Sequence, residues 1–473
     1  MNTGQNRNLY ILSRAAADAA KHMKVMKSRQ INGENRLATW QKNLLSVSIV
    51  MEKARNSGYV KRLRKLNPAY LLYILIFGIS SHSKPSLEEL YRRYIDFDDT
   101  LDSKDKIKIQ SFSNRFDEGI VKFLHEMLDY YIDSTFLDCS IKLKGSVQNL
   151  KDILIQDSSI IRVSVKLKKV WPALRSNGSA AGLKIHAVYS AISHSLKSIE
   201  ISGEREHDSK MLKIDPKVKD NLLLFDLGYY SNSIFAKIKH YGGFFVSRLK
   251  KNATPKVNKI LSASSQVKKQ FQKGMPLNDF LKKCPNKDKI DILCTFKTRF
   301  NPDGGKIKTI YTNFRVVCFW NEKTSIWHAY VTNLPKKAYS TDEIYQLYRY
   351  RWIIELLFKE LKGDYDLGNM HLAERNLTYA HIYSVLIRLA ISRNLYKFCV
   401  HEVEEEDRNS YGPQLWSKVF AEKAHEFLSI LHQDIFGDGD VIERWERLEF
   451  SLRHLAKSRH KKYQRLSLQF IAF

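Results

Sequence analysis

The sequence predicts an α/β protein: a mixed sheet covered by helices, with an all-β insertion and helical regions at both ends. Two changes of hydrophobic pattern lead to this prediction. Apolar residues recur every three or four positions up to about residue 135, and short β-rich runs replace this pattern from about residue 150. After Ser340 the helical pattern returns and continues to about residue 465. A sheet-forming middle is therefore expected between two helical ends.

The chain carries a large positive charge. It has 473 residues, and 78 Lys and Arg against 50 Asp and Glu leave a formal net charge of +28. Hydrophobic residues make up 44%, which is ordinary for a globular protein and excludes a disordered or collagenous one. A folded chain this basic and this rich in aromatic residues favours nucleic acid as the partner, with affinity that falls steeply as salt rises.

Cysteine spacing and hydropathy indicate an intracellular protein. The five cysteines show no C-x-x-C spacing, so they support neither a disulfide framework nor a zinc site. The longest apolar run, 69–77, is well short of the roughly 20 residues that span a bilayer, and the first thirty residues lack a signal-peptide core. We therefore expect a protein of the reducing cytosol that does not enter a membrane.

The first 135 residues are expected to be helical. Ser86, with Glu89 three residues later, forms a capping box at the start of one helix. The apolar spacing places the helices at 37–51, 69–79, 87–95 and 112–128. The last of them opens with side chains of the kinds that reach base edges in the major groove of DNA, namely Gln110, Ser113, Asn114 and Arg115. A plain solvated helix start explains these residues equally well.

Strands and helices alternate in the middle of the chain. The β-rich runs are 153–155, 183–192, 198–201, 222–225 and 244–246. Helical stretches at 208–218 and 233–241 separate the last three, which predicts the order β-β-β-α-β-α-β. The run 222–225 is apolar throughout, as in a buried central strand. Three further strand-like runs indicate the insertion, at 290–296, 308–319 and 327–331.

The segment 347–362 carries the strongest chemical signal. At 100° per residue, a helix places four functional side chains within about 60° of arc: Tyr348, Arg351, Glu355 and Lys362. Apolar residues between Ile353 and Leu361 occupy the opposite face, so the helix can pack on a sheet and keep a polar front. Taken alone, an ordinary charged face with an Arg351–Glu355 pair is the simpler interpretation.

Two upstream acids favour a catalytic interpretation of this helix. Asp157 follows the apolar run 153–156, and Asp226 ends the run 222–225. A carboxylate at the tip of a buried strand is costly unless a cation neutralises it, and Mg²⁺ prefers oxygen ligands. With Glu355, these acids would form an oxygen-lined pocket for two divalent ions, which suits phosphodiester displacement. The residues therefore predict a nuclease or strand-transfer site.

These residues resemble the DDE transposases of bacterial insertion sequences, in the branch named insertion-sequence-four, which carries Y-x2-R-x3-E-x6-K. Tyr348, Arg351, Glu355 and Lys362 match that spacing without a gap. Other blocks similar to the family follow one another between residues 150 and 395, at Gly182–His186, His207–Asp208, Asp226–Tyr230, Phe245–Lys250 and Val331–Pro335.

One departure from the family concerns the first acid. The family usually has Ser-Thr after it, whereas Ser158 and Ser159 follow Asp157 here. Asp133 is followed by Ser-Thr, but the residues before it have a helical pattern, so Asp157 is the better candidate.

The resemblance implies an RNase H-like catalytic core. Asp157, Asp226 and Glu355 would be the catalytic residues and the ligands of two Mg²⁺ ions, with Mn²⁺ as an alternative. Arg351 and Lys362 would hold phosphates of the transposon end, and Tyr348 would contact the DNA backbone near the cut.

The resemblance also implies a role for a tryptophan of the insertion. Some members of the branch stack a flipped base on a tryptophan about twenty residues before the signature Tyr, and Trp327 stands there. Trp320 is a second candidate, and inward packing of Trp327 on its strand is the alternative.

The implied organisation has five regions. They are a helical DNA-binding region at 1–135, the first part of the catalytic core at 136–251, the β-rich insertion at 252–338, the last part of the core at 339–403 and a basic helical region at 404–473.

The implied function is transposition: cutting DNA at insertion-sequence ends and joining the 3′-hydroxyl ends to target DNA. The partner would be double-stranded DNA, both terminal inverted repeats and target, bound by a homodimer at the nucleoid in the bacterial cytoplasm. Two alternatives stay open. One is a catalytically inactive DNA-binding protein derived from a transposase, and the other is a D…E-x-K nuclease that would use Glu360 and Lys362. That E-x-K motif normally lies on a strand, whereas here it lies on a helix.

Overall fold

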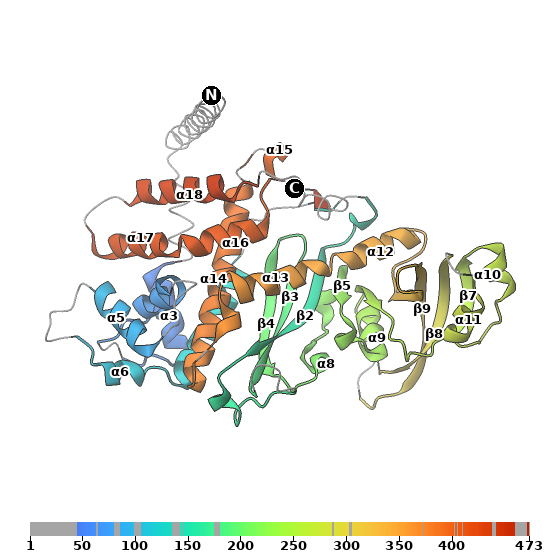
Figure 1. Ribbon diagram of the computed structural model, residues 1–473, viewed down its shortest axis with the longest axis horizontal. Coiled ribbons are helices and arrows are strands. Elements are labelled where there is room, and N and C mark those ends of the chain that lie inside the picture. Colours follow the sequence, from blue (N-terminus) through green and yellow to red (C-terminus); the bar gives the residue numbers. More distant parts are fainter. Residues whose placement is uncertain are drawn as a thin grey trace, which may run out of the picture.

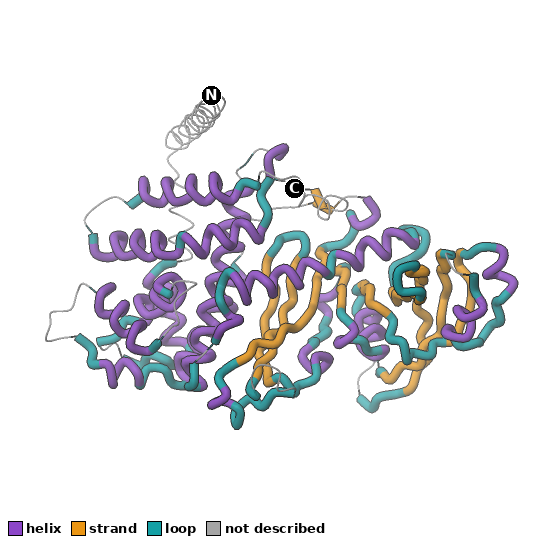
Figure 2. The backbone as a smooth tube through the Cα atoms, viewed as in Figure 1, coloured by secondary structure: helices purple, strands orange, loops and turns teal. Residues whose placement is uncertain are grey.

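One nine-stranded sheet runs through the middle of the molecule and into the insertion, with most of the helices packed at the opposite end (Figures 1 and 2). This computed structural model describes residues 45–62, 65–79, 86–98, 106–134, 142–143, 145–174, 180–285, 288–301, 305–370, 372–401, 403, 405–408, 410–437, 441–458 and 471–472.

The sheet has the strand order β4-β3-β2-β5-β6-β10-β9-β8-β7. The strands are β2 (Asp152–Arg162), β3 (Gly182–Ser190), β4 (Ser195–Gly203), β5 (Asn221–Phe225), β6 (Phe244–Arg248), β7 (Lys256–Ser262), β8 (Lys289–Arg299), β9 (Thr309–Asn321) and β10 (Ile326–Thr332). Strands β2, β5 and β6 are parallel, whereas β3 and β4 continue the sheet as an antiparallel meander. This RNase H-like arrangement confirms the predicted fold class.

The insertion continues the core sheet. Strand β10 pairs antiparallel with β6, so the four insertion strands extend the central sheet rather than form a separate one. The insertion is β-rich as expected, but it is not composed of strands alone, because α10 (Ser265–Lys269) and α11 (Leu277–Lys283) follow β7. Helices of five and seven residues are too short to produce a clear helical period in the sequence.

The N-terminal region is helical as predicted, within the part that the structure describes. Its helices are α3 (Val47–Asn56), α4 (Pro68–Tyr73), the π-helix η1 (Ile74–Gly78), α5 (Leu87–Phe97), α6 (Ile109–Ser113) and α7 (Glu118–Asp133). Residues 37–44 of the first predicted helix lie outside the described residues.

The predicted single helix at 112–128 is wrong. The chain leaves α6 at Asn114 and starts α7 after Asp117, whose carboxylate accepts the free backbone N–H groups of Gly119 and Ile120. Asp at such a position stabilises a new helix start. Asn114 and Arg115 therefore lie in the turn between two helices, and α6 is only five residues long. The proposed recognition helix does not exist in this form.

Two of the remaining helices lie between strands of the core, and the others follow the insertion in the chain. The predicted helical stretch 208–218 is shorter than expected, because α8 (Asp208–Met211) ends well before Pro216. The next α-helix along the chain is α9 (Asn232–His240). The C-terminal helices are α12 (Thr341–Arg349), α13 (Trp352–Gly363), α14 (Arg375–His401), α15 (Glu405–Arg408), α16 (Pro413–Glu422), α17 (Ala424–Phe436) and α18 (Ile442–Ala456). Two short segments, β1 (Lys142–Leu143) and β11 (Ile471–Ala472), pair with each other. The basic residues Arg459 to Arg465 lie outside the described part.

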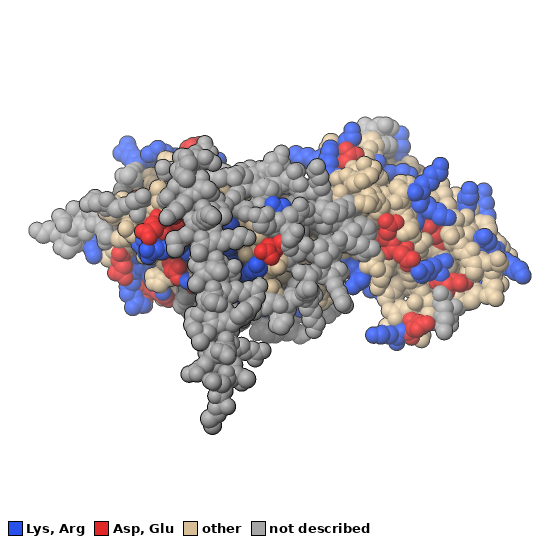
Figure 3. All heavy atoms as spheres, turned by 90° about the horizontal axis from the view of Figure 1, so that it is seen from above, with Lys and Arg blue, Asp and Glu red and all other residues tan. Residues whose placement is uncertain are grey.

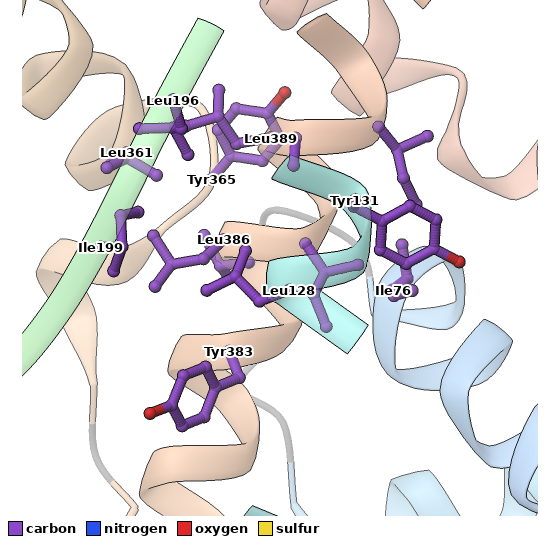
Figure 4. Close-up of a cluster of buried hydrophobic side chains, with 14 of the residues drawn as sticks. Ile76, Leu128, Tyr131, Leu196, Ile199, Leu361, Tyr365, Tyr383, Leu386 and Leu389 are labelled. Atoms are coloured by element: carbon purple, nitrogen blue, oxygen red, sulfur yellow. The ribbon is translucent and has the colours of Figure 1, made fainter. Parts of the chain in front are cut away.

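The larger hydrophobic core joins the two helical regions to one face of the sheet. Figure 4 shows its centre, where Leu128 of α7 and Leu386 of α14 approach Ile199 of β4 and Leu361 of α13. A smaller core on the other face joins α9 to the insertion: Phe235 of α9 stacks on Phe245 of β6, and both rings contact Phe314 of β9. The sheet is therefore covered on both faces, which explains why every residue of β5 is buried.

A buried ion pair fastens the insertion to the start of α12. Arg315 of β9 donates to both carboxylate oxygens of Asp291 on β8, at 2.9 and 2.8 Å, and to the carbonyl oxygen of Tyr339 at 2.8 Å. The side chains of Arg315 and Asp291 are 4% and 1% exposed. Because Tyr339 precedes α12, the pair ties this helix to the insertion.

Replacing Arg315 by Met should lower the free energy of unfolding by about 3–5 kcal/mol, because Asp291 would remain buried without its partner. The matched control is Lys289→Met, since the exposed Lys289–Asp342 pair joins the same two elements and should contribute at most about 1 kcal/mol. Urea unfolding of both variants measures the difference. Equal losses of unfolding free energy in the two variants would show that the buried pair contributes no more stability than the exposed pair.

Candidate active site

Asp157 and Asp226 lie on neighbouring parallel strands. Gln156 of β2 is in register with Phe225, the last residue of β5, so the two acids follow these partners side by side. Asp157 is not at the end of its strand, as the sequence suggested, because β2 continues to Arg162 in register with β3. Polar residues follow Asp157 directly, so the apolar pattern in the sequence does not reveal this second half of the strand.

The helix that carries Glu355 is interrupted. One continuous helix from 347 to 362 was predicted, whereas α12 ends at Arg349 and α13 begins at Trp352. At the junction the N–H groups of Tyr350 and Arg351 bond to carbonyls three residues back, at 3.1 Å each, and both residues keep right-handed helical dihedrals. The junction is therefore a tightened turn, and Arg351 occupies it.

Arg351 joins the signature helix to the sheet. One guanidinium nitrogen lies 3.2 Å from Asp157 Oδ2, and another donates to Glu355 Oε1. The guanidinium also lies 5.9 Å from the ring centroid of Tyr348. Three of the residues that the sequence predicted for the site therefore lie around a fourth, the cation of Arg351.

Asp226 and Glu355 act electrostatically on Asp157. The pKa of Asp157 is raised from 3.8 to about 6, mainly by burial and in addition by the negative charges of Asp226 and Glu355. The backbone N–H of Ser158 and the Arg351 guanidinium act in the opposite direction. At neutral pH Asp157 is therefore ionised, and keeping it ionised costs folding free energy.

The donor set fits a hard divalent cation, although Arg351 takes the cationic position here. Carboxylate oxygens are the ligands that Mg²⁺ and Mn²⁺ prefer. In the described parts of the chain, no three His, Cys, Asp or Glu side chains are grouped closely enough to hold one metal ion. Asp157 and Glu355 nevertheless contact the same guanidinium, each through a different nitrogen of Arg351.

Glu360 is separated from the site. It points into the protein, where Arg393 of α14 donates to it at 2.5 Å and also binds Pro413 O and Ser417 Oγ near α16. The side chains of Glu360 and Arg393 are 1% and 2% exposed. This pair anchors α13 to α14 and α16. Because Glu360 is engaged there, the glutamate of the E-x-K motif is not available to bind a metal ion.

Other predicted residues lie apart from the acids. Lys362 is half-buried further along α13, where burial and the positive charge of Arg162 lower its pKa. Trp327 packs against Trp320 at a centroid distance of 5.6 Å and contributes to the smaller core. Side chains alternate along β10, so Trp327 faces away from Tyr330, which contacts Tyr348. The base-stacking role of Trp327 stays a prediction.

The N-terminal candidates also lie apart from the acids, since Asn114 and Arg115 belong to the α6–α7 turn at the far side of the helical end (Figure 1). Their DNA-binding role stays a prediction. Sequence reasoning gave no role to Lys184 and Asp208, although both stood in blocks similar to the family. The structure places them directly behind Asp157, where Asp208 contacts Ser158 and Lys184.

Replacing Asp157 by Asn should stabilise the metal-free protein at about pH 7.5. Its folded-state pKa lies above its ordinary value, so ionised Asp157 costs folding free energy that is regained as the pH falls through 6 towards 4. We expect a gain of about 1 to 3 kcal/mol near pH 7.5 that disappears near pH 4. Thermal unfolding in a metal chelator measures it, and a loss at the higher pH would contradict the electrostatic picture.

Comparisons with known proteins relate this chain to one family. The family model described as "Transposase DDE domain" matches residues 148–391, which include all three acids. Within the described residues, no helix is long and apolar enough to cross a bilayer.

Several curated relatives cover most of the chain. The transposase for insertion sequence element IS1151 of Clostridium perfringens is 24% identical over 421 residues, which are 80% of this chain and 87% of the relative. The transposase for insertion sequence element IS231F of Bacillus thuringiensis subsp. israelensis is 21% identical and covers 87% and 89%. Among solved structures, a piggyBac transposase synaptic complex with hairpin DNA aligns over 91% of this chain and 87% of that one, at 10% identity and a TM-score of 0.43. Because the family model spans more than half of its length, this chain belongs to the family of DDE transposases.

Proposed function

We propose that this transposase cuts DNA at the ends of an insertion sequence and joins the freed 3′-hydroxyl ends to target DNA, with Asp157, Asp226 and Glu355 as the catalytic metal ligands. Transposases act on DNA, and enzymes with a DDE domain use divalent metal ions. The observation that carries the finer assignment is the shared guanidinium of Arg351, which brings Asp157 and Glu355 to one cation beside Asp226.

We propose Mg²⁺ as the physiological metal, two ions per site, with Mn²⁺ as an alternative. Bound there, the ions would activate water or a 3′-hydroxyl and stabilise the leaving oxygen of the phosphodiester. The protein's own part would be to hold three carboxylates from three elements at one place, because such positioning supplies much of the rate.

We propose that Arg351 exchanges its contacts with the acids for contacts with a DNA phosphate. Divalent ions would neutralise Asp157 and Glu355, so the guanidinium would no longer be needed there. Its Nε is buried and lacks a hydrogen-bond partner among the described residues, which supports a further ligand. A phosphate suits a guanidinium because two N–H groups can bind it together.

Tyr348 and Lys362 are proposed as further phosphate contacts. Burial raises the pKa of Tyr348 to about 12, so its hydroxyl stays protonated and can donate to a phosphate oxygen. Lys362 follows Glu355 by seven residues, which is about 10 Å along a helix. Tyr348 and Lys362 would therefore contact the DNA on either side of the cut.

Two copies are proposed to act together in the DNA complex, because two element ends have to be brought to one place before joining. The C-terminal helices are the proposed interface. This proposal follows from the chemistry of two-ended transposition.

Glu355→Gln should bind end-bearing DNA normally but lose cleavage by more than about a hundredfold, since even partners of a metal ligand affect activity by 10- to 100-fold. Glu360→Gln, five residues further along the same helix, should still cut at temperatures below its lowered unfolding midpoint. Cleavage of labelled end DNA in Mg²⁺ and a gel-shift assay measure the two properties.

These variants also separate the alternatives. Loss of cutting in Glu360→Gln but not in Glu355→Gln would favour the D…E-x-K nuclease. Absence of cutting by the unaltered protein, with DNA binding retained, would favour an inactive DNA-binding descendant of a transposase.

End binding should weaken steeply with salt, because the net charge of +28 favours phosphate contacts with counterion release. Figure 3 shows Lys and Arg side chains spread over the described surface of the insertion end. Lys362→Met should reduce the slope of log affinity against log salt by about 1. Lys213→Met, an exposed lysine paired with Glu200, is the control. An unchanged slope in Lys362→Met would remove this residue from the interface.

A further inference from the structure

A polar cluster lies behind Asp157, on the face of the sheet opposite α13. Asp157 reaches towards α13, where it meets Arg351, so the next residue of β2 points to the other face. There Ser158 Oγ donates to Asp208 Oδ1 at 3.1 Å, and Lys184 of β3 donates to the same oxygen at 3.0 Å. Lys184 also binds the carbonyl of Glu206, which fixes the ammonium over the start of α8.

The second oxygen of Asp208 lies against the turn that follows Asp226. A Cβ atom added to Gly228 would come within 2.8 Å of Asp208 Oδ2, so only glycine leaves room for the carboxylate there. The next residue, Tyr229, bonds through its hydroxyl to His186 Nδ1 at 3.1 Å, and that ring nitrogen lies 3.9 Å from Asp208 Oδ1. The turn is therefore held close to the Asp208 carboxylate.

One carboxylate thus connects three segments that flank the proposed catalytic acids. It contacts β2 through Ser158, whose own N–H donates to Asp157 Oδ1 at 2.8 Å. It contacts β3 through Lys184, and it abuts the turn directly after Asp226 at Gly228. Because Asp208 lies on the opposite face, it cannot itself reach a metal ion held by Asp157.

We propose that Asp208 is a positioning residue, which holds the Asp157 strand and the Asp226 turn at the separation that divalent metal binding requires. Two carboxylates that share ions repel each other while no ion is bound, so a tie on the far side of the sheet resists their separation. Ligands must stay within about 0.5 Å of their productive places, and neighbouring hydrogen bonds usually provide this precision. The proposal rests on the metal site assigned above.

The test measures Mn²⁺ binding directly, by electron paramagnetic resonance of free Mn²⁺ titrated with the full-length chain. Asp208→Ala removes the tie, and Gly228→Ala displaces the carboxylate without changing it. Both should raise the dissociation constant for Mn²⁺ about tenfold, and cleavage should recover at saturating Mn²⁺. Asp215→Asn is the control, because this aspartate lies in the same connection between β4 and β5 but caps only a short turn.

Thermal unfolding in a metal chelator separates positioning from general stability. A lower unfolding temperature with unchanged Mn²⁺ binding would mean that Asp208 only stabilises the fold, and would overturn the proposal. Should Asp208→Ala fail to fold, Gly228→Ala and Asp208→Asn answer the same question. Asp157→Asn is the reference: unchanged Mn²⁺ binding in that variant would reject the metal site itself, whereas weakening in it alone would reject only the role of Asp208.

Discussion

Repulsion between half-buried carboxylates is the constraint at the centre of the candidate site. Asp157, Asp226 and Glu355 come from a strand, a turn and a helix, and the charges of the latter two raise the pKa of Asp157. Arg351 offsets this repulsion in front of the sheet by bridging two of the acids. Behind the sheet, the Asp208 carboxylate contacts β2 through Ser158 and β3 through Lys184. Positive charge in front of the sheet and hydrogen bonds behind it therefore both act on the segment around Asp157.

The elements that carry these acids are themselves held by buried ion pairs. Glu360 and Arg393 fasten α13 to α14 and to the start of α16, so the C-terminal helices support the helix that bears Glu355. Arg315 and Asp291 fasten the insertion to the segment before α12. Buried pairs of this kind add little net stability compared with apolar packing, but breaking one is costly. Their value here is that they fix how distant regions meet.

Much of the fold could be predicted because its signals are local. The strands of the core, the buried character of β5 and the N-terminal helices all follow from apolar spacing within a few residues. The failures have local causes too. Asp117 starts a new helix within an apparently continuous pattern, and α10 and α11 are too short to show a period. That the insertion extends the core sheet could not be predicted, since backbone pairing between β6 and β10 leaves no pattern in side-chain spacing.

For the site, local sequence patterns identify the available side chains: two acids after apolar strand segments, and a Tyr-Arg-Glu-Lys series at helical spacing. Which of them meet depends on the tertiary structure. It broke the helix at Arg351, turned that side chain towards Asp157, buried Glu360 against Arg393 and directed Trp327 away from Tyr348. It also placed Asp208 behind the acids. Contacts between residues about two hundred positions apart depend on how sheet and helices pack, and packing is a property of the whole core rather than of any short segment.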